Sequence, residues 1–469
     1  MAREEFDLII IGSGPGGYVA GIRAGQLGMK VAVVEKDPKV GGTCTLRGCI
    51  PTKALLHTAE VLDEIRDAEG LGIVVGAPAL DIDKAQDRKQ KVVDANSKGI
   101  DYLFKKNKVT TLRGFGRLTG VTDLNEAEVE VEGADGKVTY GAKHVIIATG
   151  SVPRDIAIAP ADGERILNSD HILELRRVPA SLAVLGAGAV GTEFASVYAS
   201  FGTKVTLIEM LPRILPIEDE ECSAELQRAL RKRGIEVLAG AKMSSVERTE
   251  TGVRLHLEGG KKDTVEAELL LSAIGRRPVT ENIGLEALGI ELERGYVKVN
   301  PLMQTHVPTI YAIGDVINTP WLAHVASAEG ILAVEHMAGL PVKPLNYDRV
   351  PSCTYCDPEV ASVGLTEAKA RERGYDVAVG KFPFSALGKA RIVGKTEGFV
   401  KVVREKKYDE VLGVHIVGVH ATDLIAEACV ALQLEGTDEE LLRTMHAHPT
   451  LSEAVMEAAH AAHGAAIHI

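Results

Sequence analysis

Residues 6–35 read FDLIIIGSGPGGYVAGIRAGQLGMKVAVVE. The apolar run at the start is typical of a buried parallel strand. Gly12, Gly14 and Gly17 follow in a GxGxxG register, then a helix-like stretch, and a second apolar run ends at Glu35. Together these form the complete fingerprint of a dinucleotide-binding βαβ unit. The glycines permit a tight turn close to a pyrophosphate, the helix N-terminus attracts its charge, and the acid accepts hydrogen bonds from a ribose.

The same unit occurs again at residues 182–209, which read LAVLGAGAVGTEFASVYASFGTKVTLIE. Its glycines are Gly186, Gly188 and Gly191, and its second apolar run ends at Glu209. The first glycine and the acid are 23 residues apart in both copies. One GxGxxG is a weak signal, whereas two complete units with identical spacing predict two dinucleotide sites. Two such sites in one chain suggest two dinucleotides that exchange electrons.

Three further strand exits favour a flavin in the first site. HVIIATG ends at Gly150, and LLLSAIGRRP turns around Gly275. TIYAIGDV places Asp315 just after a strand and a glycine. Each fragment alone is compatible with an ordinary strand exit, so the prediction rests on their joint presence in this order.

Composition and charge limit the class of protein. The chain has 469 residues, enough for about three domains. Hydrophobic residues make up 45% and charged residues 25%, as in an ordinary soluble globular protein. The net charge of −12 disfavours nucleic acid and anionic membranes as partners. The N-terminal stretch lacks a basic signal region, and no apolar run has the roughly 18 residues of a spanning helix. We therefore expect a cytoplasmic protein.

Residues 41–53, GGTCTLRGCIPTK, hold Cys44 and Cys49 five positions apart. On an ideal helix, Cα atoms at this separation lie about 8.6 Å apart, whereas a disulfide requires about 4.4–6.8 Å. The segment therefore cannot be regular helix between two paired cysteines, and its three glycines allow it to bend. A structural disulfide, half of a metal site and a redox pair are all compatible with this spacing. The two nucleotide sites favour a redox pair, in which the disulfide forms and breaks.

The remaining cysteines and the terminal histidines leave alternatives open. Six cysteines in so long a chain do not form a disulfide scaffold. Cys353 and Cys356 form a CxxC, which either completes a metal site with the first pair or consists of incidental thiols. Cys222 and Cys429 are expected to be packing residues. Three histidines near the C-terminus are expected to be helix or tail residues rather than metal ligands: His460, His463 and His468.

Taken together, the motifs resemble the pyridine nucleotide-disulfide oxidoreductases. The resemblance rests on the cysteine segment, both GxGxxG units, ATG, AIGDV and a C-terminal HPTLSE, and it runs almost end to end. It is strongest to members that oxidise protein-bound dihydrolipoamide with NAD in 2-oxo acid dehydrogenase or glycine cleavage complexes. It implies an α/β fold with two Rossmann-like dinucleotide-binding domains, for FAD and NAD, and a C-terminal α+β dimerisation domain. The implied bounds are 1–149 with 276–344 for FAD, 150–275 for NAD and 345–469 for dimerisation.

The resemblance also implies roles for residues around the cysteines. Cys44 is the interchange thiol that meets the substrate, and Cys49 lies over the flavin. Lys53 sits by the flavin ring and pairs with Glu193. The family usually has an uncharged residue at the position of Arg47, which either lowers the pKa of a nearby thiol or is a solvated turn residue.

Near the C-terminus, the family pattern HPTxxE selects His448 as the base and Glu453 as the acid that orients it. A thiol must lose its proton before it attacks a disulfide, and an imidazole held by a carboxylate suits that work. His446, two residues earlier, is the alternative base. Residues implied to contact the two dinucleotides are Gly12, Gly14, Gly17, Glu35, Lys53, Gly150, Asp315, Ala323, Gly186, Gly188, Gly191, Glu193, Glu209 and Gly275.

The partners implied are a second copy of the chain, with active sites shared between chains, and the lipoyl domains and acyltransferase core of a 2-oxo acid dehydrogenase complex. A glutathione reductase-like enzyme is the main rival, but such enzymes use NADPH and carry basic residues where this chain has Glu209. A mercuric reductase carries an extra C-terminal cysteine pair, and this chain ends HGAAIHI. The third alternative is a structural subunit with an idle redox centre.

Overall fold

The computed structural model describes residues 4–122 and 126–469. The chain folds into two compact units, each assembled from three separate segments. The first comprises Met1–Ala54, Gln86–Arg154 and Arg276–Tyr347, and the second comprises Leu55–Ala85, Asp155–Gly275 and Asp348–Ile469. The predicted division into three domains is finer than this one and stays a prediction.

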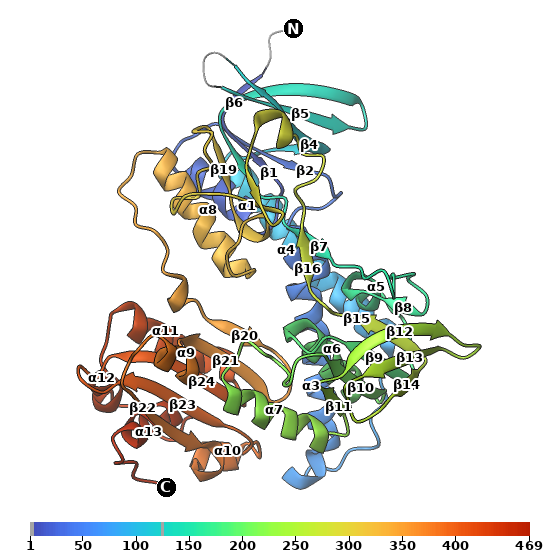
Figure 1. The fold of residues 1–469 in the computed structure, drawn as a ribbon, viewed down its shortest axis with the longest axis vertical. Helices are drawn as coiled ribbons and strands as arrows, with labels where there is room; N and C mark the ends of the chain where they lie inside the picture. Colours follow the sequence, from blue (N-terminus) through green and yellow to red (C-terminus); the bar gives the residue numbers. More distant parts are fainter. Residues whose placement is uncertain (1–3, 123–125) are drawn as a thin grey trace. The chain divides into compact units, whose positions relative to one another are not determined.

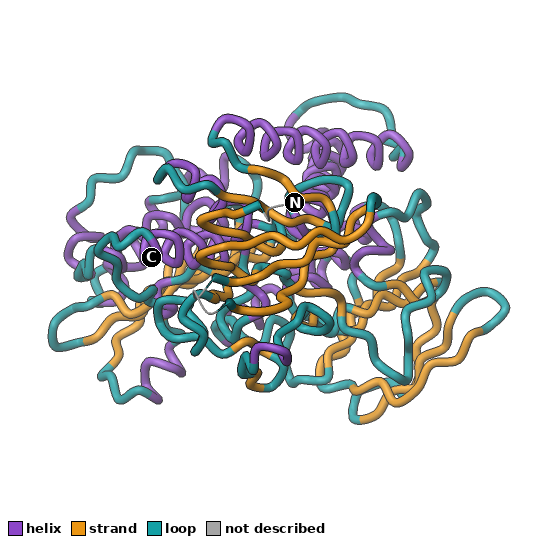
Figure 2. Tube along the Cα trace, turned by 90° about the horizontal axis from the view of Figure 1, so that it is seen from above, coloured by secondary structure: helices purple, strands orange, loops and turns teal. Residues whose placement is uncertain are grey.

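A mainly parallel sheet forms the centre of the first unit (Figure 1), and Figure 2 shows it from above with its strands in orange. Its parallel strands are β1 (Glu5–Ile11), β2 (Val31–Glu35), β3 (Thr110–Arg113), β6 (Gly136–Ile147) and β19 (Ile310–Ala312). They follow the order β3-β2-β1-β6, and β19 also pairs with β6. β1 and β2 are mostly apolar and buried, because the strands of a parallel sheet are covered on both faces.

Antiparallel strands extend this sheet at one edge, and two separate strand pairs complete the unit. β4 (Phe115–Val121) and β5 (Ala127–Gly133) form a meander with the first half of β6. β7 (Ser151–Pro153) pairs with β16 (Arg276–Pro278), so the chain leaves the unit and returns to it at adjacent points. β17 (Leu292–Glu293) pairs with β18 (Tyr296–Val297).

Two helices of the first unit pack directly against each other: α1 (Pro15–Gln26) and α8 (Ala323–Met337) (Figure 1). A Cβ on Gly330 would lie 2.7 Å from the carbonyl oxygen of Gly16, so this close approach requires glycine. α2 (Gly42–Arg47) belongs to the same unit, whereas α3 (Cys49–Arg66) and α4 (Ile82–Lys106) each run from one unit into the other.

The second unit contains a parallel sheet that repeats the first arrangement. Its strands, in the order β11-β10-β9-β15-β8, are β11 (Glu236–Ala239), β10 (Lys204–Glu209), β9 (Ser181–Leu185), β15 (Leu269–Ser272) and β8 (Ile166–Leu167). α6 (Ala189–Ser200) connects β9 to β10 as α1 connects β1 to β2. The unit also holds α5 (Ser169–Leu173), α7 (Glu220–Lys232) and a three-stranded sheet of β12 (Lys242–Arg248), β13 (Val253–Glu258) and β14 (Thr264–Ala267).

An antiparallel sheet from the C-terminal third of the chain completes the second unit. Its order is β20-β21-β24-β23-β22, for β20 (Ser352–Thr354), β21 (Glu359–Gly364), β24 (Val411–Gly418), β23 (Phe399–Glu405) and β22 (Val377–Pro383). α11 (Ala421–Gln433) packs on β21 and β24, and α13 (Glu453–Ala462) packs on β22 and β23. The shorter helices are α9 (Glu367–Glu372), α10 (Gly388–Ile392) and α12 (Asp438–Arg443).

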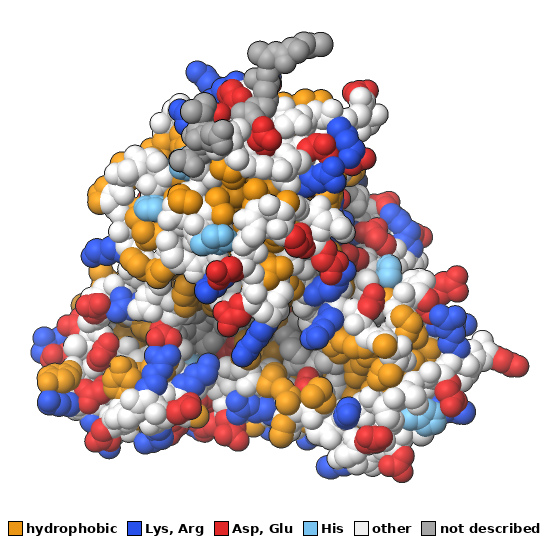
Figure 3. Space-filling view, turned by 45° about the horizontal axis from the view of Figure 1, so that its top comes forward, with side chains coloured by type: hydrophobic (Ala, Val, Ile, Leu, Met, Phe, Trp, Pro, Cys, Tyr) orange, Lys and Arg blue, Asp and Glu red, His pale blue; other side chains and the backbone are white. Residues whose placement is uncertain are grey.

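These sheets confirm the predicted fold class. Both βαβ units begin and end within two residues of the predicted ranges. Within residues 4–122 and 126–469, none of the helices combines the length and apolar character that a bilayer crossing requires. Acidic and basic side chains are interspersed on the face drawn in Figure 3.

Candidate active site

The first glycine turn has the geometry that its three glycines predict. Gly12 has a φ of +109°, and a Cβ there would lie 2.3 Å from the carbonyl oxygen of Ala148, so only glycine fits between β1 and the exit of β6. A Cβ on Gly17 would lie 1.9 Å from the oxygen of Gly12, so glycine allows α1 to approach β1. A Cβ on Gly14 would meet nothing within 4 Å. Its backbone therefore faces open space that a pyrophosphate can enter.

The second glycine turn repeats this geometry. Gly186 has a φ of +98°, and its Cβ would lie 2.5 Å from the oxygen of Ala273. A Cβ on Gly191 would lie 1.9 Å from the oxygen of Gly186, and one on Gly188 would meet nothing within 4 Å. The N-caps of α1 and α6, which are Gly14 and Gly188, have no capping side chain. The N–H groups of both first turns therefore suit an anionic ligand.

Glu35 closes the first glycine turn. It is only 6% exposed, and it accepts hydrogen bonds from the N–H groups of Ser13 at 3.0 Å and Asp37 at 2.8 Å. The hydroxyl of Ser13 also donates to Glu35, at 2.5 Å. A carboxylate oxygen accepts more than one hydrogen bond, so Glu35 can hold the turn and still accept from a ribose. Turn, helix start and acid together fit a dinucleotide.

Glu209 closes the second turn in the same way. It is 7% exposed and accepts from the N–H groups of Ala187 at 2.8 Å and Leu211 at 2.9 Å. The cation that follows it in sequence, Arg213, donates to the carbonyl oxygen of Pro216 at 2.9 Å. The second site therefore presents a carboxylate where an additional phosphate would require a cation.

Asp315 lies in a 3₁₀ turn, η3 (Gly314–Val316), at the exit of β19. Its Oδ2 accepts a hydrogen bond from the Ser151 hydroxyl at 2.5 Å, and Nε of Arg276 donates to that hydroxyl at 2.7 Å. Burial raises the pKa of Asp315, and the bond from Ser151 opposes this shift. Gly150, with a φ of +70°, directs the chain into Ser151. Ser151 and Arg276 lie on β7 and β16, so this short ribbon fixes one side of the Asp315 carboxylate.

The other two predicted dinucleotide contacts also lie at backbone turns. Gly275 has a φ of +110°, and a Cβ there would meet nothing within 4 Å. Ala323 is the first residue of α8, whose N-cap Leu322 provides no side-chain hydrogen bond. Both positions leave backbone accessible to a ligand, and their contacts with a cofactor stay predictions.

Cys44 and Cys49 lie on two helices that meet at Gly48. α2 ends at Arg47, Gly48 has a φ of −145° and a ψ of −114°, and α3 begins at Cys49. The segment therefore departs from regular helix between the cysteines, as disulfide geometry requires. A hydrogen bond to Cys49 and burial raise the pKa of Cys44 far above its ordinary value, and the charge of Lys53 opposes this shift. The two cysteines are neighbouring thiols, placed to form or break one S–S bond.

The cysteine segment is fixed to the first glycine turn. Gly42 has a φ of +58°, and a Cβ there would lie 2.6 Å from the Cα of Gly14. The N–H of Gly41 donates to the hydroxyl of Ser13 at 3.0 Å, and the same hydroxyl donates to Glu35. The cysteine segment and the first glycine turn are therefore one connected structure.

The three charged residues that the resemblance assigns to the cysteine site are Lys53, Glu193 and Arg47. Lys53 lies one turn after the second cysteine, on the same side of α3. Glu193 is buried and accepts from the N–H of Tyr355 at 3.0 Å. Lys53 and Glu193 belong to different units, so their pairing stays a prediction. Arg47 is 38% exposed and forms an ion pair with Asp37, so a carboxylate already compensates its charge.

His448 lies in the loop before α13 and is 79% exposed. Its Nδ1 is 2.8 Å from Oε1 of Glu453, whose Oε2 accepts from the N–H of Thr450 at 2.8 Å. The peptide bond between His448 and Pro449 is cis. Burial alone would raise the pKa of Glu453, but the hydrogen bonds from Thr450 and His448 outweigh it, and the pKa is lowered. Glu453 is therefore an ionised carboxylate that holds Nδ1, which leaves Nε2 for proton transfer.

Three other histidines near the C-terminus have carboxylate partners. The His446 side chain is 5% exposed, and its Nε2 lies 2.5 Å from Oε1 of Glu427 on α11. It is thus less accessible to a substrate than His448. Two terminal histidines pair with buried carboxylates: His463 with Asp438 at 2.9 Å and His468 with Glu457 at 2.8 Å.

The remaining cysteines lie outside the dithiol. Cys356 is buried, and its thiol donates to the carbonyl oxygen of Pro358 at 3.1 Å. Burial raises the pKa of this thiol well above its ordinary range. Cys353 is half-buried on β20. Cys222 is part of one buried core cluster of the second unit, and Cys429 packs against another, which confirms their prediction as packing residues.

Sequence reasoning missed the hydroxyl groups that hold the predicted acids. Ser13 occupies a variable position of the GxGxxG motif, so the motif gives no signal for it. Ser151 directly follows the ATG fragment, but its partner Asp315 is 164 residues away. The tripeptide HPT does contain a signal for Thr450, since it places a backbone donor three residues before Glu453.

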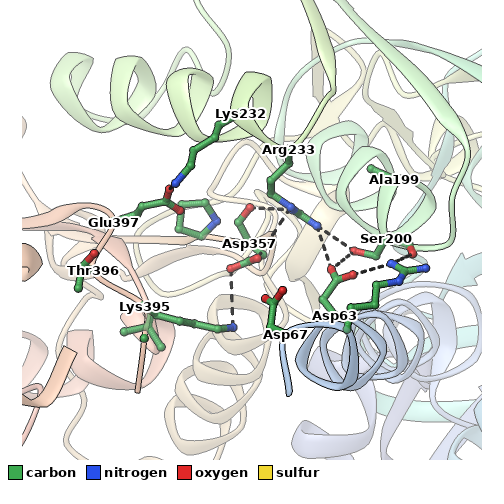
Figure 4. Close-up of a pocket in the computed structure, with 14 residues that line it drawn as sticks. Asp63, Asp67, Ala199, Ser200, Lys232, Arg233, Asp357, Lys395, Thr396 and Glu397 are labelled. Carbon is green, nitrogen blue, oxygen red and sulfur yellow. Dashed lines mark hydrogen bonds and ion pairs between the residues drawn. The ribbon is translucent and has the colours of Figure 1, made fainter. Parts of the chain in front are cut away.

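A charged pocket of about 490 Å³ lies in the second unit (Figure 4), and none of the predicted site residues line it. Four cations and four carboxylates line it. Arg233 donates to the Ser200 hydroxyl at 2.8 Å and lies 3.4 Å from Asp63, while Lys232 lies 2.5 Å from Glu397. The charges therefore compensate one another and select no ligand class.

Comparison with known proteins agrees with this arrangement. The chain matches the pyridine nucleotide-disulphide oxidoreductase family over residues 6–330 and the dimerisation domain of that family over residues 350–459. The chain belongs to this family, which confirms the resemblance seen in its motifs. Members of the family use FAD and NAD, as the two glycine units predict.

Individual relatives define the class further. The chain is 47% identical over 471 residues to the dihydrolipoyl dehydrogenase of Bacillus subtilis (strain 168), with 99% of each chain covered. It is 41% identical to the mitochondrial dihydrolipoyl dehydrogenase of Pisum sativum, covering 99% of this chain and 93% of that protein. The crystal structure of LpdA from Mycobacterium tuberculosis matches with a TM-score of 0.90 and 30% identity, covering 97% of this chain and 99% of LpdA.

Proposed function

We propose that the chain is a dihydrolipoyl dehydrogenase, which oxidises protein-bound dihydrolipoamide to lipoamide and reduces NAD. The observation that carries this proposal is the attachment of the Cys44–Cys49 segment to the first glycine turn through Gly42 and Gly41. A dithiol fixed beside one dinucleotide site, in a chain with a second such site, suits transfer of an electron pair from thiols to NAD. Relatives of full-length similarity that bear this name support it.

The first unit binds FAD and the second binds NAD. Gly12, Gly14 and Gly17 admit the FAD pyrophosphate, Glu35 accepts from its ribose, and Asp315 contacts it from the exit of β19. The corresponding residues of the second glycine unit hold NAD. When bound, FAD would supply the acceptor for the electron pair of the dithiol and the hydride donor for NAD.

The residues of this chain carry out the thiol chemistry. His448 removes the proton from one substrate thiol, and the thiolate attacks Sγ of Cys44. A substrate–Cys44 bond forms as the Cys44–Cys49 bond breaks, and Cys49 leaves as a thiolate. The second substrate sulfur then attacks the first, which releases lipoamide, and its proton ends on Cys44. Two electrons pass from substrate to protein, and the first proton stays on His448.

Glu453 makes His448 suitable for this role. Because its carboxylate accepts from Nδ1, the neutral imidazole presents Nε2 as the acceptor, and the carboxylate stabilises the imidazolium that forms. The hydrogen bond from Thr450 fixes the carboxylate itself. Base and orienting acid are thus placed by one loop and the first residue of α13.

The dimerisation domain shows that the protein is built to form a homodimer. We further propose that the active site is shared, with His448 of one chain serving Cys44 of the other. The partners beyond the dimer are lipoyl domains and the acyltransferase core of a 2-oxo acid dehydrogenase complex, and the location is the cytoplasm.

A mixed dimer tests the shared site. We expect a dimer of one Cys44→Ser chain and one His448→Ala chain to recover near half of the parental activity. One of its two sites combines both lesions, while the other takes an intact thiol and an intact base from different chains. The measurement is turnover by a separately tagged, co-purified heterodimer, with each homodimeric variant as the control. Activity no higher than that of the two controls, with FAD bound, would show that thiol and base act within one chain.

We expect a preference for NAD over NADP of at least about tenfold in kcat/KM, equivalent to roughly 1.4 kcal/mol. Glu209 accepts from ribose hydroxyls and repels a phosphate at that position, and Arg213 is occupied by the Pro216 carbonyl. The Glu209→Gln variant should lose most of this preference, because the amide removes the repulsion. Equal kcat/KM for both nucleotides in the parent protein would contradict the assignment.

The direct test of the substrate is a pair of assays. The purified protein should reduce NAD with dihydrolipoamide and should show negligible reduction of glutathione disulfide with NADPH. The reverse result would identify the protein as a glutathione reductase-like enzyme. Inactivity in both assays with FAD bound would indicate a structural subunit.

A further inference from the structure

Glu329 is a fully buried carboxylate in the middle of α8. Its exposed fraction is 0%. Its Oε2 accepts a hydrogen bond from the N–H of Gly314 at 2.7 Å, and its Oε1 accepts from the hydroxyl of Tyr347 at 2.9 Å. Each carboxylate oxygen therefore accepts from a donor that lies outside the helix.

The first donor belongs to the turn that carries Asp315. Gly314 has a φ of +71°, in the left-handed region that favours glycine. A Cβ at this position would also lie 3.2 Å from the Cβ of Ala326 on α8. The Gly314 N–H thus points at Glu329, and the next residue carries its carboxylate toward Ser151. Glu329 therefore holds the backbone of the turn, and Ser151 holds its carboxylate.

Burying the Glu329 carboxylate close to Asp315 costs free energy of folding. Burial raises the pKa of Glu329, the hydrogen bonds from Gly314 and Tyr347 oppose this shift, and the negative charge of Asp315 adds to it. Burial also raises the pKa of Asp315. Buried ionised groups are expensive, and replacing them with neutral residues of similar volume is often neutral or stabilising. A fully buried carboxylate beside a partly buried one therefore suggests a requirement other than stability.

Tyr347 supplies the second donor from 18 residues further along the chain, beyond the end of α8. It begins η4 (Tyr347–Arg349) and is the last residue of the first unit. Burial and the neighbouring carboxylate raise the pKa of its phenol. The phenol therefore remains protonated and serves as a fixed donor to Oε1, which orients the Glu329 carboxylate so that Oε2 meets Gly314.

We propose that Glu329 is a positioning residue for FAD, which fixes the Asp315 turn in its cofactor-binding conformation, and that Tyr347 acts through it. The inference rests on the proposed contact between FAD and Asp315. Glu329 itself lies behind the turn, so its effect on FAD passes through the Gly314 N–H.

The test is the dissociation constant of FAD, measured by titrating the apoprotein. Glu329→Gln keeps the size of the side chain and should weaken FAD binding at least about tenfold, because a charge-assisted hydrogen bond to the turn is lost. Tyr347→Phe should weaken it about three- to tenfold. The double variant should bind FAD no more weakly than Glu329→Gln alone, because both changes act on one carboxylate.

Tyr311→Phe is the matched control. The Tyr311 hydroxyl lies 3.0 Å from Nδ1 of His336, so this variant also removes a hydroxyl bonded to α8, but at the C-terminal end of the helix, about two turns after Glu329. FAD affinity in this variant should stay within about twofold of the parental value. The visible circular dichroism of the bound flavin should change in Glu329→Gln and remain unchanged in Tyr311→Phe.

Two further measurements separate the possible failures. The thermal midpoint of the Glu329→Gln apoprotein should equal or exceed that of the parent apoprotein. If the thermal midpoint of Glu329→Gln fell, and Tyr311→Phe lost as much FAD affinity as Glu329→Gln, then Glu329 would have only a general structural role. Asp315→Asn should also weaken FAD binding, and parental affinity there would overturn the placement of FAD at this turn. Weak binding in Asp315→Asn with parental binding in Glu329→Gln would overturn the role of Glu329 alone.

Discussion

Replacing Cys44 by serine is expected to lower dihydrolipoamide oxidation by at least about 10⁴-fold while FAD stays bound. A hydroxyl cannot form the disulfide that accepts electrons, and the substrate thiolate has no sulfur to attack. The dinucleotide turn should survive, because the contacts of the cysteine segment with it run through Gly41 and Gly42 rather than through the thiol. The measurements are turnover with NAD and the flavin content of the purified variant.

A double variant, Cys353→Ser with Cys356→Ser, is the matched control. Cys353 is half-buried like Cys44, and Cys356 donates only to a backbone carbonyl. We expect this variant to keep most of the parental turnover, since neither thiol belongs to the dithiol. Loss of its activity with FAD bound, or zinc in the parent protein, would show that the second pair takes part in the chemistry.

Replacing His448 by alanine is expected to lower turnover about 10²- to 10⁴-fold, the usual contribution of a positioned general base. The loss should appear in kcat and kcat/KM together, because proton removal belongs to the transition state. Glu453→Gln should cause a smaller loss, since the imidazole remains but its orientation and its charged form are less well supported. Steady-state kinetics with dihydrolipoamide and NAD measure both effects.

The chain offers a close control for this experiment in His468. Its Nδ1 lies 2.8 Å from Oε1 of Glu457, and His448 has the same distance to Glu453, with both glutamates on α13. Both imidazoles are largely exposed. His468→Gln should leave turnover within about twofold of the parental rate. Equal losses in His448→Ala and His468→Gln would mean that the helix, and not the base, is being perturbed.

Local patterns predicted the parts of the site that lie close together in sequence. Both glycine turns, their acids and the break at Gly48 follow from short-range rules of backbone geometry. The pairing of His448 with Glu453 also spans only five residues. In each case, spacing along the chain restricts the distance between side chains, so sequence is informative.

Partners supplied by distant segments were not predictable in this way. Ser151 meets Asp315 and Arg276 only because the chain leaves the first unit and returns to it. Tyr347 meets Glu329 from 18 residues further along the chain, beyond the end of α8. Glu329 also looks like an ordinary helical acid in the sequence, where burial is invisible. Long-range topology, rather than local propensity, decides these contacts.

Counting free thiols at Cys44 and Cys49 tests the central claim most directly. Samples of the oxidised holoenzyme are alkylated anaerobically at three points: before substrate is added, after one equivalent of dihydrolipoamide, and after a subsequent excess of NAD. Mass spectrometry then measures the alkylation of each cysteine. If electrons pass through this pair, both cysteines should be protected at first, become alkylated after dihydrolipoamide, and be protected again after NAD. Labelling that stays the same in all three states, while dihydrolipoamide still reduces NAD, would contradict the account.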